Sequence, residues 1–94
     1  MHYEILINGN STTPGRALPI LVIEELTRIA DNLDAKIMVK PLGGFLYSMY
    51  LYNTSSHESL LYLFTKVTEV IRNHQIDVVC STLHKGKAPF SVGA

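Results

Sequence analysis

The alternation of apolar and polar residues along this chain predicts four short β-strands, and a helical repeat of apolar residues predicts two α-helices. In the first strand Tyr3, Ile5 and Ile7 face one side, and the residues between them face the other. Gly9 and the polar residues after it break this pattern. The strands are predicted over residues 3–8, 36–40, 45–52 and 76–83, and the helices begin near residues 19 and 56.

Single residues and short motifs predict where several of these helices and strands begin or end. Pro19 suits the first turn of a helix, where its missing N–H costs nothing. Gly43 and Gly44 suit a tight reversal with positive φ between the second and third strands. Ser55, followed three residues later by Glu58, predicts a capping box at the start of the second helix.

The first helix carries more apolar residues than one face of a sheet requires. We therefore expect it to contact something besides the sheet. Its predicted core stripe is Ile20, Ile23, Leu26, Ala30 and Leu33, broadened by Leu18, Leu21, Val22 and Ile29.

The order of elements, β-α-β-β-α-β, predicts an α+β ferredoxin-like sandwich. Right-handed crossovers would place both helices on one face of a four-stranded antiparallel sheet. Ninety-four residues suffice for one core but not for two. We expect a single domain over residues 1–84 and a loose C-terminal tail over residues 85–94.

Residue parity assigns each strand side chain to one of the two sheet faces. A sheet face in water should be mostly polar, yet the predicted open face keeps a set of apolar side chains. We expect this face to form a homodimer or homotetramer contact; the alternative is a monomer with an apolar face. The expected interface residues are Leu6, Met38, Leu46, Tyr50, Val79 and Leu83. The helix side is expected to hold Tyr3, Ile5, Ile7, Ile37, Val39, Phe45, Tyr47, Met49, Leu51, Ile76, Val78 and Cys80.

The composition of the chain argues against nucleic acids and membranes as binding partners. The chain is 47% hydrophobic and 17% charged with a net charge of zero, so it has no basic excess for a nucleic-acid backbone. The single cysteine, Cys80, excludes an internal disulfide. No stretch reaches the roughly 20 apolar residues that span a bilayer. No signal peptide is visible, so we expect a cytoplasmic protein without a membrane partner.

No motif for a reaction, a metal or a cofactor is present. His2, His57, His74 and His84 are scattered without carboxylates at ligand spacing, and we interpret them as surface histidines rather than metal ligands. Without a visible acid–base pair or activated nucleophile, an enzyme is not expected. Catalysis would need residues from across a subunit boundary.

Residues 44–47, Gly-Phe-Leu-Tyr, invite comparison with the RNA-recognition signature, which shares this topology. The match is poor, because that signature requires aromatic residues that face outward. Parity instead places Phe45 and Tyr47 under the helices, so RNA binding is disfavoured.

A ligand pocket is predicted on the helix side, beside the start of the first helix. The hydroxyls of Thr12 and Thr13, with Tyr47 and Cys80 in an apolar layer, would orient a small heterocycle. The alternative is structural: Thr residues before a helix cap it, Tyr47 is core, and Cys80 is a buried thiol.

Three segments resemble the small thiamine-binding family of ferredoxin-like proteins: Asn8–Pro14, Pro41–Gly43 and Val78–Thr82. The chain departs from the family in ending its first strand with Ile-Asn-Gly, where members more often have Pro-Leu-Gly. The resemblance implies dimers or tetramers formed through open sheet faces, and thiamine or its pyrimidine moiety bound near the helix-covered side. We therefore expect a non-catalytic small-molecule-binding oligomer without a resident cofactor. The alternative is a self-assembling or partner-binding regulatory module with no small ligand.

Overall fold

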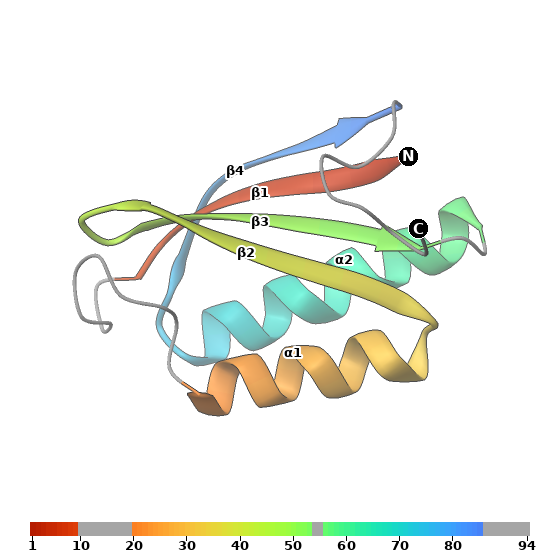
Figure 1. The fold of residues 1–94 in the computed structure, drawn as a ribbon, viewed down its shortest axis with the longest axis horizontal. Coiled ribbons are helices and arrows are strands. Elements are labelled where there is room, and N and C mark those ends of the chain that lie inside the picture. The colour runs from red at the N-terminus through yellow and green to blue at the C-terminus, as the bar shows by residue number, and fades with distance from the viewer. Residues whose placement is uncertain (10–19, 54–55, 86–94) are drawn as a thin grey trace.

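A computed structural model describes residues 1–9, 20–53 and 56–85 of the chain. The four strands form one antiparallel sheet in the order β2-β3-β1-β4, and both helices cover the same face of it (Figure 1). This confirms the predicted α+β ferredoxin-like arrangement. The elements are β1 (His2–Asn8), α1 (Ile20–Asn32), β2 (Ala35–Gly43), β3 (Leu46–Asn53), α2 (His57–Asn73) and β4 (Asp77–His84).

The core lies between the sheet and the two helices. Its central strands β1 and β3 contribute fully buried side chains at alternate positions, as the parity of these strands predicts. Full burial of one such side chain contributes about 1.5–3 kcal/mol. The buried cluster is Ile5, Ile7, Val22, Leu26, Tyr47, Met49, Leu51, Leu60, Leu63, Val67, Ile71 and Ile76.

A register shift in β4 changes which residues face the helices. Leu6 pairs with Cys80, but the next residue, Ile7, pairs with Val78, so Val79 is the extra residue of a β-bulge. Because Leu6 belongs to the open face, its partner Cys80 lies there too, and the thiol is exposed. The prediction that Cys80 is buried on the helix side is therefore wrong.

The same bulge moves another predicted interface residue. Leu83 pairs with Tyr3, whose ring stacks on Phe64 of α2 with centroids 4.4 Å apart. Leu83 thus lies on the helix side of the sheet, at its rim, and not on the open face. Val79 occupies the bulge itself, with 53% of its surface exposed.

The first helix is rotated relative to its predicted stripe. Val22, Leu26 and Ala30 are the buried positions, whereas Ile23 is exposed at the groove between α1 and β2. The excess of apolar residues on α1 has two outcomes: Ile29 packs on the core, and Leu21 remains exposed.

The turn between β2 and β3 agrees with the sequence prediction, whereas the start of α2 differs from it by one residue. Gly43 and Gly44 both adopt positive φ, as predicted for the reversal between β2 and β3, and Phe45 belongs to this turn rather than to the strand. The second helix is capped one residue later than predicted. The Ser56 side chain accepts a hydrogen bond from the Ser59 N–H at 3.1 Å.

Candidate functional site

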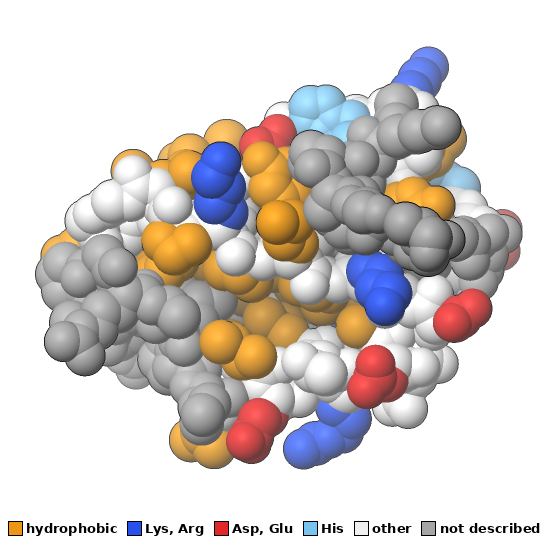
Figure 2. Space-filling model, viewed as in Figure 1, with side chains coloured by type: hydrophobic (Ala, Val, Ile, Leu, Met, Phe, Trp, Pro, Cys, Tyr) orange, Lys and Arg blue, Asp and Glu red, His pale blue; other side chains and the backbone are white. Residues whose placement is uncertain are grey.

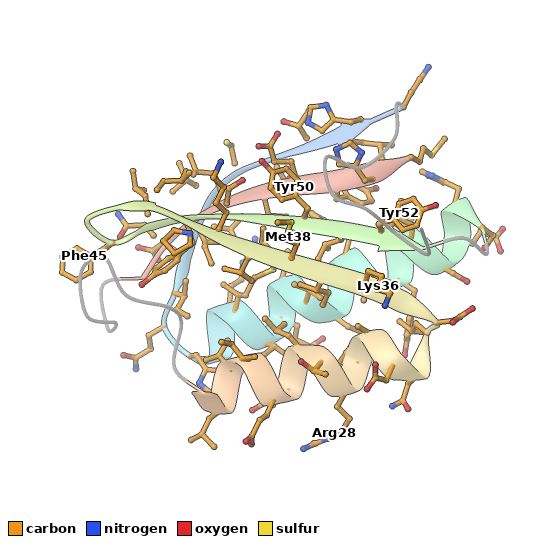
Figure 3. All side chains as sticks on the ribbon, viewed as in Figure 1. Arg28, Lys36, Met38, Phe45, Tyr50 and Tyr52 are labelled. Atoms are coloured by element: carbon orange, nitrogen blue, oxygen red, sulfur yellow. The ribbon has the colours of Figure 1, made fainter. Side chains whose placement is uncertain are left out.

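The open face of the sheet carries an ordered array of polar and aromatic side chains. In antiparallel sheets, residues directly opposite one another on neighbouring strands lie in rows across the face. No described element covers this face, and Figure 3 shows Tyr50 on the side of the sheet away from the helices. From β2 to β4 the rows read Lys36, Tyr52, His2, His84, then Met38, Tyr50, Glu4, Thr82, and then Lys40, Ser48, Leu6, Cys80.

Glu4 lies at the centre of this array and is hydrogen-bonded to residues of both neighbouring strands. His84 Nε2 lies 2.9 Å from Glu4 Oε1, and the Ser48 hydroxyl donates to Oε2 at 3.2 Å. The Tyr50 side chain also hydrogen-bonds the carboxylate. Glu4 thereby connects its own strand, β1, to both β3 and β4. We call Glu4, Ser48, Tyr50, His84 and His2 the Glu4 cluster.

The cluster lowers the pKa of Glu4 below its ordinary value. The hydrogen bond from His84 is the largest cause, and bonds from Ser48 and Tyr50 and the charge of His84 act in the same direction. Partial burial opposes them by raising the pKa. Each hydrogen bond favours the ionised form of the carboxyl group. Together with the charge of His84 they outweigh the effect of burial, so the pKa of Glu4 is lowered overall. Glu4 is therefore a carboxylate at neutral pH.

His2 forms an aromatic wall of the cluster. Its ring stacks on the His84 ring, with centroids 4.8 Å apart and planes inclined by 20°, and lies 6.2 Å from the Tyr50 ring. Only 6% of the surface of His2 is exposed. The interpretation of all four histidines as surface residues is thus wrong for His2, which is buried.

The hydrogen bond to Glu4 determines where the proton of neutral His84 resides. An ionised carboxylate can only accept, so the ring nitrogen that contacts it, Nε2, must carry the hydrogen. The other nitrogen, Nδ1, then presents a lone pair. A carboxylate that orients an imidazole in this way is a recurrent arrangement in proton transfer.

The predicted ligand pocket is not assembled by the described residues. Tyr47 is fully buried beneath the helices, and Cys80 lies on the opposite face of the sheet. Thr12 and Thr13 lie outside the described residues.

Four of the six predicted interface residues do lie on the open face: Leu6, Met38, Leu46 and Tyr50. They do not form one continuous apolar patch, because Glu4 and Ser48 lie among them. The face is also less apolar than predicted, because Leu83 lies on the helix side of the sheet.

Sequence reasoning missed the pairing of Glu4 with His84. Parity correctly placed Glu4 on the open face, but His84 was expected just beyond the last strand. The signal available was the recurrence of His2, Glu4 and Leu6 at every second position. The partner across the sheet depends on the pairing of β1 with β4, which no local pattern specifies.

Two further features lie away from the cluster. An apolar groove of about 230 Å³ runs between α1 and the edge strand β2, lined by Ile23, Leu26, Thr27, Ile37 and Val39. Orange side chains mark this hollow in Figure 2. At the C-terminal end of α2, His74 Nε2 lies 3.1 Å from Glu25 Oε1 and connects α2 to the middle of α1.

Within the described ranges, no group of three or more His, Cys, Asp or Glu side chains is arranged to hold a metal ion. None of the helices described combines the length and the apolar character that a bilayer span requires.

Comparison with known proteins adds no family assignment: neither a protein-family model nor a curated protein sequence matches this chain.

Proposed function

We propose that this protein is a small-molecule-binding protein that acts as a homo-oligomer and holds its ligand on the open face of the sheet. The observation that carries the proposal is the Glu4 carboxylate beside the rings of His2, His84 and Tyr50. A carboxylate next to aromatic rings suits a planar heterocycle with a positively charged or proton-donating nitrogen. Thiamine and its pyrimidine moiety belong to this class.

The carboxylate retains capacity for a ligand. Two carboxylate oxygens offer about four acceptor positions. His84, Ser48 and Tyr50 occupy three of them. Counted over the described residues, this leaves one acceptor position for an N–H of the ligand.

Oligomerisation would supply the walls that a single sheet face lacks. Small ligands bind in clefts that bury most of their surface, and one sheet face cannot provide this alone. Met38 and Leu46 are 40% and 39% exposed on the open face. The zero net charge of the chain also opposes association only weakly. A second copy laid over this face would bury these side chains and enclose the Glu4 cluster.

A thermal-shift series with thiamine, its phosphates and the aminopyrimidine fragment tests the proposal, with light scattering on the same samples. Ligand binding to the folded state raises the melting temperature as ligand concentration exceeds Kd. Loss of a hydrogen bond to a charged group is worth about 1.5–3 kcal/mol, so Glu4→Gln should weaken binding roughly 10- to 100-fold. Glu24→Gln, an exposed change on α1, is the matched control and should bind like the parent. Equal melting shifts in the parent and in Glu4→Gln would refute a site at Glu4.

A second candidate is the assembly module without a small ligand. It is favoured by the complete burial of the Tyr47 side chain in the core. The same experiment separates the two candidates. A stable oligomer whose melting temperature is unchanged by every compound would favour the assembly module.

A further inference from the structure

We propose that His84, oriented by Glu4, acts as a general base that removes a proton from a planar heterocycle bound on the open face. This inference rests on the proposed ligand site and adds an activity to it. It makes the protein a catalyst of proton abstraction, with His84 as the catalytic residue and Glu4 as a positioning residue.

The geometry of the Glu4–His84 pair sets the tautomer and the orientation of the imidazole. The 2.9 Å contact with Glu4 Oε1 holds the hydrogen of neutral His84 on Nε2 and leaves the lone pair on Nδ1. The second carboxylate oxygen is held by Ser48 at 3.2 Å, so the carboxylate is itself restrained. An imidazole whose tautomer and orientation are both set in advance is what a general base requires.

Two aromatic rings, those of His2 and Tyr50, lie beside the His84 imidazole or near it. The His2 ring covers one side of the His84 ring at 4.8 Å, and this limits its rotation. In the single chain the His84 side chain is nevertheless 41% exposed, so a ligand can reach it from the open face. The nearby ring of Tyr50 offers a planar ligand a surface to stack on.

The proposed step transfers one proton and needs no oxidant or reductant. The ligand C–H bond breaks, its proton goes to Nδ1 of His84, and its electron pair stays on the ligand. The imidazolium that forms is stabilised by the adjacent Glu4 carboxylate, which does not itself take the proton. Release of the proton from Nδ1 to water restores the base.

5-Nitrobenzisoxazole is a suitable probe because it is a planar heterocycle whose conversion requires only a base. A base takes the C3 proton, the C–H electron pair forms the nitrile, the N–O bond breaks, and a coloured phenolate leaves. Positioned general bases accelerate such reactions about 10²- to 10⁴-fold. We expect saturable conversion, at least about 100-fold faster than with free imidazole at the same concentration.

A pair of matched histidine variants tests whether His84 is the base. His84→Gln should reduce the rate to that of free imidazole, whereas His57→Gln, a change at an exposed histidine on α2, should retain the parental rate. A parental rate in His84→Gln would overturn the inference, provided that its circular dichroism matches that of the parent.

A measurement on the unmodified protein guards against a variant that does not fold. Long-range ¹H–¹⁵N spectra of the neutral His84 ring should show the proton on Nε2, and Glu4→Leu, which removes the acceptor, should shift the population toward the other tautomer. A purely structural Glu4 would leave the tautomer unchanged. A proton on Nδ1 in the parent would overturn the inference.

Binding measured separately distinguishes this inference from the proposed function. Benzotriazole is planar and has no proton whose removal breaks a ring bond, so calorimetry with it reports binding alone. Binding of benzotriazole without accelerated conversion of the benzisoxazole would refute the base but leave the ligand site standing. Absence of both would refute both.

Discussion

Glu4 and His84 are separated by 80 positions in the sequence, and their side chains meet at 2.9 Å on the open face of the sheet. The contact joins the first strand to the last, across the pairing of β1 with β4. It also gives the open face a carboxylate–imidazole pair that neither half of the chain contains alone.

The pH dependence of stability should report the Glu4 cluster. Because the folded state lowers the pKa of Glu4 below 4.5, the ionised carboxylate stabilises the fold above pH 4.5. That contribution is lost as the pH falls through the lower folded pKa. We expect the melting temperature of the parent to fall more steeply than that of Glu4→Gln between pH 5 and pH 2. Parallel curves from differential scanning calorimetry would contradict the assigned contacts.

The Tyr47 side chain should behave as core rather than as a ligand contact. It is fully buried among the side chains under the helices, and truncation of a large buried side chain costs about 3–5 kcal/mol. We expect Tyr47→Ala to lower the free energy of unfolding by that amount in urea titrations. Tyr62→Ala removes a ring that is 52% exposed and should cost under about 1 kcal/mol. A comparably small loss for Tyr47→Ala would show that the site is not packed as described.

The open face should mediate assembly. Met38 lies in the row of Tyr50 and Glu4, and a carboxylate placed there would be desolvated in a face-to-face contact. We expect Met38→Glu to reduce the molar mass measured by light scattering to that of one chain. Leu21→Glu, on the outer side of α1, is the control and should keep the parental mass. Identical masses for both variants and the parent would exclude this face as the contact.

The reactivity of Cys80 tests the bulge in β4. The exposed thiol should react with Ellman's reagent in the folded monomer, without denaturant. Met38→Glu is the suitable background, because a partner on the open face would shield the thiol. A thiol that reacts only after unfolding would mean that β4 lacks the register shift and that Cys80 faces the core.

The local pattern of the sequence was sufficient for the fold and for most of the sheet. Period-two alternation in β1, β2 and β3 correctly assigned Ile5, Met49 and Met38 to their faces, because the β1–β3 and β2–β3 pairings are regular at these residues. The register shift in β2 lies beyond them, between Pro41 and Gly43. The tight turn between β2 and β3 could also be predicted from its two adjacent glycines, because a backbone with positive φ favours glycine. These signals act within a few residues and need no knowledge of the rest of the chain.

Parity failed where the regular pattern was interrupted. One extra residue, Val79, moved Cys80 to the open face and Leu83 to the helix side, because a shift of one position exchanges the faces. The bulge has no distinct local signature in this strand. Its position depends on how β4 pairs with β1.

By itself, the sequence determined the order of elements, the antiparallel sheet with two helices on one face, and the placement of Glu4 on the open face. The tertiary structure alone decided that His84, Ser48 and Tyr50 surround this carboxylate. The physical reason is that contacts across a sheet depend on the register between strands distant in sequence. That register is set by the joint packing of all six elements.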